Sequence, residues 1–123
     1  MPYNKELGKV GEEEARKYLL QNDYTIIKNN YTCKCGEIDI IAQKEEYIIF
    51  IEVKTRTNSN YGFPIESISL KKRKSIIKSA KVFLLQKKIT DSAVRFDVIE
   101  VLTGTGKDSS CNINHIENAF WEE

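Results

Sequence analysis

The chain has 123 residues, of which 41% are hydrophobic and 30% are charged. This composition is typical of one folded domain and excludes an intrinsically disordered chain. No apolar run approaches the roughly 20 residues that a membrane-spanning helix needs. The segment from Met1 to Glu6 has neither the basic nor the apolar region of a signal peptide. The sequence therefore predicts a single cytoplasmic domain over residues 1–123, with no membrane contact.

The net charge of +1 conceals an uneven distribution along the chain. Residues 1–52 have seven basic against ten acidic side chains, and residues 91–123 have two against seven. Residues 53–90 have ten basic side chains against one acidic, a net of +9. Such a basic block is typical of a surface that binds a polyanion, although a solvated lysine-rich helix would give the same count.

The first predicted element is a helix over residues 5–22. Five residues at steps of three and four form one stripe on it: Gly8, Gly11, Glu12, Ala15 and Leu19. Two glycines and an alanine on one stripe indicate close approach to a neighbouring element, because glycine otherwise costs a helix about 1 kcal/mol. Glu12 lies on this stripe and should point inward.

Three strands follow, over residues 24–31, 37–43 and 47–55, because these runs are rich in β-branched and aromatic residues. A turn over 33–36 joins the first two. Glu45-Glu46 joins the second and third, which should therefore form an antiparallel hairpin.

Residues 56–68 have the composition of a loop, and Tyr61 and Phe63 within it are candidates for folding over a substrate or wedging into it. Ser69 is the predicted N-cap of a helix over about 70–88. Later elements are a strand over 94–102, a polar loop over 103–110 and a short edge strand over 112–116. The helix between the third and fourth strands predicts a parallel crossover. The predicted fold is α/β, with a mixed sheet flanked by helices in the order α-β-β-β-α-β(-β).

Charged residues interrupt the apolar strands of the predicted hairpin. Asp39 lies in one strand, and Glu52 and Lys54 lie in the other. An ionised group in an apolar strand is costly unless it is paired or holds a metal. If Glu45-Glu46 is the turn, Asp39 lies opposite Glu52, with Cβ atoms about 4.5–5.5 Å apart. Because side chains alternate along a strand, Lys54 shares that face.

Asp39 and Glu52 are candidate ligands of Mg²⁺ or Mn²⁺, with the backbone carbonyl of Val53 as a further donor. Opposed carboxylates repel each other, and hard cations prefer oxygen ligands. Such a metal would polarise a phosphate and lower the pKa of a bound water. Lys54 would orient that water or stabilise charge on the phosphate.

Two more acids are candidates for the same site. Glu12 would bind the metal directly or through water, and Glu37 is a weaker candidate on the face of Asp39. The alternative is purely structural: a cross-strand salt bridge in which Lys54 neutralises Asp39. The hairpin placement, the inward Glu12 and the basic block that follows favour hydrolysis of a phosphodiester bond.

The basic block supplies candidate nucleic-acid contacts, which are Arg56, Lys71, Lys72, Arg73, Lys74 and Lys78. Contacts to phosphate position a nucleic acid without reading its sequence. No base-reading motif is recognisable, so we expect structure-selective or nonspecific binding that weakens steeply with salt.

The sequence resembles the PD-(D/E)XK nuclease superfamily and, more closely, the YraN-type family of small predicted endonucleases. The matching stretches are Gly8 to Glu12 with Ala15 and Leu19, Asn30-Tyr31, Gly36 to Ile41, Phe50 to Arg56, Tyr61 to Pro64, Lys72, and Arg95 to Val98. Ile38 stands where the superfamily name has a proline. The resemblance implies a restriction-endonuclease-like core that acts on DNA with Mg²⁺ or Mn²⁺.

In that resemblance, Asp39, Glu52 and Lys54 form the catalytic triad, and Glu12 is a helix-borne acid. The last feature is similar to archaeal Holliday-junction resolvases, which suggests branched DNA as one possible substrate. Resolvase-like action would require two active sites and hence a homodimer. A non-catalytic nucleic-acid-binding module that uses the same basic face is the alternative.

Two further patterns carry other chemistry. Cys33, Cys35, Cys111 and His115 are four zinc-ligand types, but their spacing is not that of the usual zinc sites. Arg95 and Asp97 alternate with apolar residues in a strand, which favours a structural ion pair over a phosphate contact by Arg95.

Overall fold

The computed structural model describes residues 5–56, 68–103 and 111–122. Its elements are α1 (Lys5–Gln21), β1 (Thr25–Cys33), β2 (Gly36–Lys44), β3 (Tyr47–Arg56), α2 (Leu70–Gln86), β4 (Ala93–Thr103) and β5 (Cys111–Phe120). The order α-β-β-β-α-β-β confirms the predicted α/β fold. The predicted loops over 56–68 and 103–110, with Tyr61 and Phe63, fall almost entirely outside the described residues.

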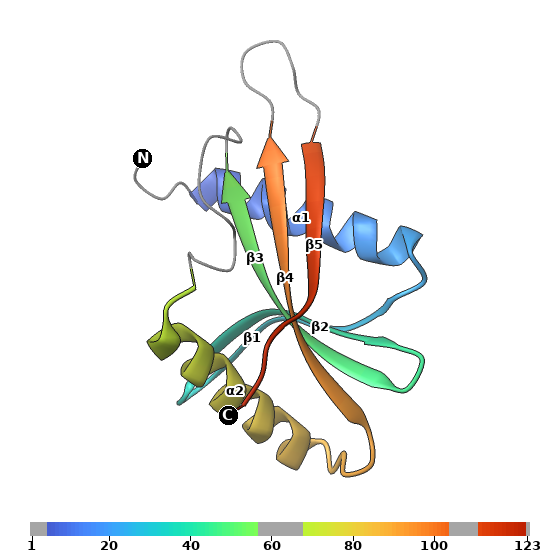
Figure 1. Ribbon diagram of the computed structural model, residues 1–123, viewed down its shortest axis with the longest axis vertical. Helices are drawn as coiled ribbons and strands as arrows, with labels where there is room; N and C mark the ends of the chain where they lie inside the picture. The colour runs from blue at the N-terminus through green and yellow to red at the C-terminus, as the bar shows by residue number, and fades with distance from the viewer. Residues whose placement is uncertain (1–4, 57–67, 104–110, 123) are drawn as a thin grey trace.

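The strands form one five-stranded mixed sheet in the order β1-β2-β3-β4-β5. β1, β2 and β3 pair antiparallel, β3 and β4 pair parallel, and β5 pairs antiparallel with β4. The connection through α2 accounts for the parallel pair, as predicted. Figure 1 shows α1 and α2 on opposite sides of the twisted sheet, so the fold has three layers.

Each face of the sheet has its own hydrophobic core. On the α2 face, Phe50 and Val98 pack against Ile76 and Phe83 of the helix. On the α1 face, residues including Ile49 and Ile51 pack against Ala15 and Leu19. β3 lies in the middle of the sheet, and its successive side chains alternate between the two cores. Glu52 and Lys54 therefore follow Phe50 onto the α2 face.

The predicted hairpin register is confirmed. Five β2–β3 pairs run from Lys44↔Tyr47 to Ile40↔Ile51. The turn between them places Glu45 in the left-handed region, at φ 55°. This register brings the next residues of the two strands, Asp39 and Glu52, to the end of the ladder.

β2 is irregular at Asp39. Ile38 packs in the core of the α2 face, but Ile40, two residues later, packs in the core of the α1 face. Residues two apart in a regular strand share a face, so the strand turns over at Asp39. On the neighbouring strand, Asn30 adopts a positive φ of 52°. Asp39 therefore lies where the β1–β2 hairpin bends, between the two faces of the sheet.

The helices begin and pack largely as predicted. Ser69 caps α2, and its Oγ accepts a hydrogen bond of 3.1 Å from the backbone N–H of Lys72. Gly11 of α1 lies so close to β3 that an added Cβ would be 1.8 Å from Oγ1 of Thr55. This contact explains the glycine at position 11, because any larger residue there would hold the helix away from the sheet.

The C-terminal strand was predicted too short. β5 runs over ten residues rather than over 112–116. Its register against β4 shifts between Phe96 and Val98, and Asn118 has a φ of 52°. This irregularity breaks the alternation of apolar and polar residues, which would otherwise have extended the predicted strand.

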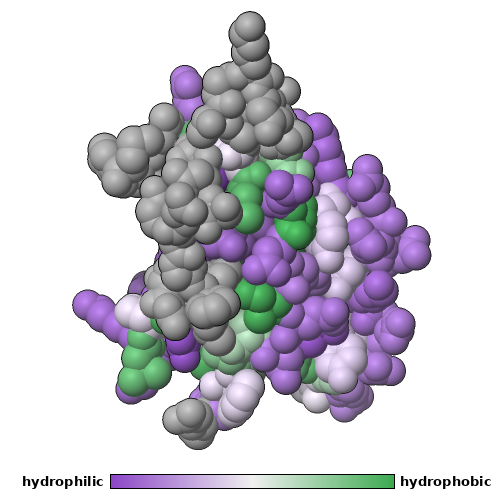
Figure 2. Space-filling model, turned by 45° about the horizontal axis from the view of Figure 1, so that its top comes forward, coloured by the Kyte–Doolittle hydropathy of each residue, from purple (hydrophilic) through white to green (hydrophobic). Residues whose placement is uncertain are grey.

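Within the described residues, no helix is long and apolar enough to cross a membrane. On the face shown in Figure 2, hydrophobic residues form small patches separated by hydrophilic ones.

Candidate active site

The carboxylates of Asp39 and Glu52 meet at the end of the β2–β3 ladder. Oδ2 of Asp39 accepts a hydrogen bond of 2.8 Å from the backbone N–H of Val53, which fixes the Asp39 side chain across the strands. The two carboxyl groups are also joined by a side-chain hydrogen bond. Two carboxylates this close share a proton when no cation lies between them.

Burial and Asp39 together raise the pKa of Glu52. Glu52 is only 6% exposed. Burial is the largest cause, followed by the hydrogen bond and the negative charge of Asp39, and they raise this pKa from 4.5 to about 8. Lys72 and Lys54 act in the opposite direction. Glu52 is therefore protonated at neutral pH in this structure.

Two lysines from different elements lie near Glu52. Nζ of Lys72, in the first turn of α2, is 3.6 Å from Oε2 of Glu52. Lys54 lies on the same face of β3 as Glu52 and lowers its pKa electrostatically. Lys72 was expected from the sequence only as a nucleic-acid contact. Its partner Glu52 lies on another element, and no local pattern in the sequence could have revealed their contact.

Glu12 approaches the site from α1. Burial is the largest cause that raises its pKa, and the negative charge of Asp39 is the second. Arg16 and a side-chain hydrogen bond with Asn30 oppose this rise. Glu12 is thus half-buried beside the bend in the β1–β2 hairpin, as its place on the inward stripe predicted. Glu37 is exposed, and its negative charge raises the pKa of Glu12 less than burial and Asp39 do.

The donor set fits a hard cation that keeps part of its water shell. No three carboxylate, thiol or imidazole groups among residues 5–56, 68–103 and 111–122 lie close enough to surround one ion. The structure therefore does not gather Glu12 into one donor set with Asp39 and Glu52. A pair of carboxylates is nevertheless what Mg²⁺ usually takes from a protein, because waters and substrate phosphates complete its octahedron.

Glu100 is an acidic residue near the site that sequence reasoning missed. It is 6% exposed on β4, and its backbone pairs with Lys54 across the parallel ladder. Its Oε2 lies 2.7 Å from Nε of Arg56, so Arg56 is ion-paired within the sheet. The signal in the sequence was a glutamate between Ile99 and Val101 in an apolar strand, the same signal that marked Asp39.

The predicted nucleic-acid contacts on α2 divide into two groups. Lys71, Lys74 and Lys78 are exposed, and Lys72 and Arg73 are half-buried. Arg73 donates a hydrogen bond of 3.1 Å from Nε to the carbonyl of Ile68 and lies over the Phe120 ring. Among the predicted nucleic-acid contacts on α2, the three exposed lysines are therefore the most accessible to solvent.

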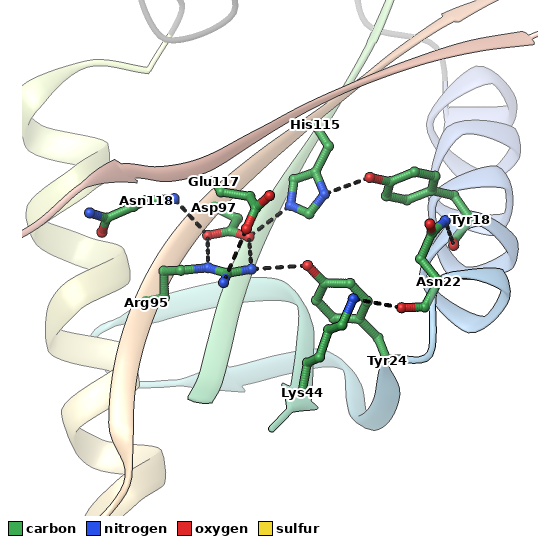
Figure 3. A network of polar contacts seen from close by, with 9 residues as sticks. All are labelled: Tyr18, Asn22, Tyr24, Lys44, Arg95, Asp97, His115, Glu117 and Asn118. Atoms are coloured by element: carbon green, nitrogen blue, oxygen red, sulfur yellow. Dashed lines mark hydrogen bonds and ion pairs between the residues drawn. The ribbon is translucent and has the colours of Figure 1, made fainter. Parts of the chain in front are cut away.

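A second polar centre lies on the α1 face, around Asp97 (Figure 3). Asp97 is fully buried, and its carboxylate accepts two hydrogen bonds from Arg95, each of 2.9 Å. It also accepts a bond from the backbone N–H of Asn118 and contacts Nε2 of His115 at 2.7 Å. The predicted structural ion pair of Arg95 and Asp97 is thus present.

This centre joins α1 to the sheet. Nδ1 of His115 lies 2.8 Å from the hydroxyl of Tyr18, and Arg95 donates a 3.0 Å bond to the hydroxyl of Tyr24. A neutral His115 satisfies both contacts if Nε2 donates to Asp97 and Nδ1 accepts from Tyr18. Sequence reasoning missed Tyr18 and Tyr24 because they lie more than 70 residues from their partners.

The four candidate zinc ligands do not converge. Cys33 packs against the core of the α2 face, whereas Cys111 packs against the core of the α1 face. His115 is engaged with Asp97 and Tyr18. The sheet separates the two halves of the set, so these residues do not form a zinc site.

Comparison with known proteins gives one family. The model of a family described as "Uncharacterised protein family UPF0102" matches residues 11–101, which include Glu12, Asp39, Glu52 and Lys54. A UPF0102 protein of Clostridioides difficile is 48% identical over 117 residues, covering 95% of this chain and 98% of its own. A UPF0102 protein of Clostridium kluyveri is 45% identical over 118 residues and 96% of each chain. The chain therefore belongs to the UPF0102 family, in agreement with its YraN-type resemblance.

Proposed function

We propose that this protein is a metal-dependent nuclease that hydrolyses phosphodiester bonds of DNA. The observation that supports this most directly is the contact between the carboxyl groups of Asp39 and Glu52. Glu52 is buried and lies beside Lys54, and its pKa is raised to about 8. A cation between these groups would remove their repulsion. The resemblance to the PD-(D/E)XK superfamily assigns the same three residues.

Asp39 and Glu52 would hold Mg²⁺ or Mn²⁺. When bound, the cation would supply positive charge to a phosphate and a water of lowered pKa. Glu52 must release its proton to act as a ligand, and Asp39 is already oriented by the Val53 N–H. Lys54, on the same face, would donate to the attacking water or to a phosphate oxygen.

Lys72 is placed to act in binding. Its ammonium is 3.6 Å from Glu52 and 38% exposed, so it faces both the site and solvent. In the complex it would contact the phosphate nearest the scissile bond. The exposed lysines of α2 extend this positive charge away from the site, which fits a polyanion that runs along the helix.

The direct test is cleavage of labelled linear, flapped and four-way DNA with Mg²⁺, with Mn²⁺ and with EDTA. We expect cleavage that requires the metal and is lost in Asp39→Asn and Lys54→Met. Glu46→Gln, in the exposed hairpin turn, is a control that should keep full activity. Cleavage that survives in EDTA, or in both site variants, would contradict the proposal. Preference for the branched substrates would extend it to structure-selective cleavage.

The basic face of α2 also supports a second candidate, a nucleic-acid-binding module without catalysis. In that case DNA would bind in gel-shift assays with equal affinity in the wild type and in Asp39→Asn, and no metal would promote cleavage. If DNA does not bind at all, both candidates fail, and the result supports a structural or partner-binding protein whose carboxylates only form ion pairs.

A further inference from the structure

The turn that joins β1 to β2 brings two thiols together. Cys33 is the last residue of β1 and pairs with Gly36, the first residue of β2. Lys34 and Cys35 form the turn between them. Both cysteines are free thiols, and the Cys35 side chain is one of the groups that lower the pKa of Cys33. A close pair of thiols in a short turn is the starting geometry for a disulfide between them.

The surroundings of Cys33 stabilise a thiolate. A side-chain hydrogen bond with Ser79 is the largest influence on this thiol. Backbone hydrogen bonds from Cys35 and Gly36 act in the same direction, and together they lower the pKa of Cys33 although burial raises it. A thiol that only filled space in the core would have no need of so many polar contacts.

Ser79 of α2 is the residue that stabilises a Cys33 thiolate most. Its hydroxyl donates a 2.9 Å bond to the carbonyl of Ser75, and the same hydroxyl is the largest cause that lowers the pKa of Cys33. A hydroxyl has one proton, and in this structure that of Ser79 is directed to the Ser75 carbonyl. Rotation about the Cβ–Oγ bond of Ser79 would turn this proton toward a Cys33 thiolate, which accords with the lowered pKa.

The turn is held firmly against α2. Oγ of Ser75 donates a 2.7 Å bond to the carbonyl of Cys35. Gly36 adopts a φ of 147°, and a Cβ there would lie 2.2 Å from Oγ of Ser75. Only glycine fits this position, so the close approach of the turn to the helix is built into the sequence.

The thiols are also accessible. Cys33 and Cys35 line an open hollow together with Thr32, Lys34, Gly36, Glu37, Lys72 and Ser75. Cys35 is exposed, and Cys33 is half-buried at the inner side. Two lysines in the lining, Lys34 and Lys72, favour an anionic reactant and a thiolate.

We propose that Cys33 and Cys35 form a thiol–disulfide exchange site that reacts with anionic low-molecular-mass disulfides. The Cys33 thiolate attacks one sulfur of the disulfide, forms a mixed disulfide, and releases the other half as a thiolate that takes up a proton. Cys35 then loses its proton and attacks the Cys33 sulfur, which releases the second half as a thiol. One Cys33–Cys35 disulfide forms, and one small disulfide is reduced to two thiols by two electrons.

The test treats the reduced full-length protein with oxidised glutathione and follows the products by mass spectrometry. We expect an internal disulfide in the wild type, and a stable glutathione adduct on Cys33 in Cys35→Ser. In Cys33→Ser the reaction should slow about tenfold or more, since the thiolate is the nucleophile. Cys111→Ser, on the other core, is the matched control and should behave as the wild type.

The role of Ser79 gives an independent readout. Ser79→Ala should shift the pH profile of Cys33 alkylation by iodoacetamide to higher pH, with no change at Cys111. The proposal is overturned if Cys33 in the folded protein reacts no faster than in urea, or if Cys35→Ser accumulates no adduct. These assays contain no metal and no nucleic acid, so their outcome is separate from that of the nuclease proposal.

Discussion

Glu52 combines three properties in one side chain: it is buried, it touches another carboxyl group, and it lies beside two lysines. Its folded-state pKa is raised from 4.5 to about 8. Between these values the folded protein binds a proton that the unfolded chain has released. The stability contributed by the protonated group is therefore complete below pH 4.5 and is lost as pH rises through about 8.

We predict that the free energy of unfolding of the metal-free protein falls by roughly 2–4 kcal/mol across this range. Glu52→Gln removes the titrating group, so its unfolding energy should change much less. Urea unfolding at about pH 5 and about pH 9 measures both. Added Mg²⁺ should restore stability at high pH in the wild type only. Parallel pH profiles for the two proteins would contradict this prediction.

The positions of some site residues could be predicted from the sequence, and those of others could not. Asp39, Glu52 and Lys54 were recognisable because an ionised group in an apolar strand needs a partner, and the two-residue turn fixed their register. The contact between Lys72 and Glu52 was not predictable. It depends on where α2 begins relative to β3, and this is decided by packing between elements that are distant in the sequence.

At the scale of the elements, α1 and β3 approach each other through Gly11. An added Cβ there would lie 1.8 Å from Oγ1 and 2.9 Å from Cβ of Thr55. Rotation of the Thr55 side chain moves Oγ1 but not Cβ, so the helix itself must shift.

We predict that Gly11→Ala lowers the free energy of unfolding by about 1–3 kcal/mol, although alanine favours a helix. Chemical denaturation measures the loss. Thr55→Gly removes the opposing side chain, so the double variant should recover part of the loss in a double-mutant cycle. Additive effects of the two substitutions would show that the two residues do not oppose each other.

The exposed lysines of α2 give a prediction that concerns binding. Replacing Lys71, Lys74 and Lys78 with alanine should weaken DNA binding equally for all sequences. It should also reduce the slope of log affinity against log salt by about 0.9 per lost phosphate contact. Titrations at several salt concentrations measure the slope. Lys9→Ala/Lys17→Ala, on exposed positions of α1, is the control and should leave the slope unchanged.

The elements themselves were largely predictable. Their periodicity, the Ser69 cap and the short hairpin turn are local signals, so the local sequence was enough to predict them. β5 was underestimated because its irregularity at Asn118 is imposed by pairing with β4. The ion pair of Arg56 and Glu100 could not be predicted from local sequence either, because it depends on the parallel register of β3 and β4.

At the scale of the whole molecule, Asp97 ties α1, β4 and β5 together. Burial raises its pKa, but hydrogen bonds from His115, Arg95 and Asn118 outweigh burial and lower it below 3.8. A depressed folded-state pKa contributes stability above the unfolded value, and this stability is lost as pH falls through the folded value. The loss should therefore occur below about pH 3.8.

We predict that Asp97→Asn costs about 2–5 kcal/mol at pH 7, because it leaves the Arg95 charge in the sheet without its buried partner. The acid-induced loss of stability should also become less steep. Glu117→Gln is the matched control, because Glu117 pairs with the same arginine but its side chain is 61% exposed. The control should cost about 1 kcal/mol or less. Equal losses in the two variants would contradict the role of the buried network.

The irregular residues of the outer strands have a consequence for association between molecules. β1 and β5 are the edges of the sheet, and each has a register shift and an asparagine in the left-handed conformation, Asn30 and Asn118. Bulges of this kind interrupt the row of backbone donors and acceptors through which sheets of separate chains join. The described edge strands are therefore poorly suited to pairing with the edge of a sheet in another molecule, which reduces edge-to-edge aggregation.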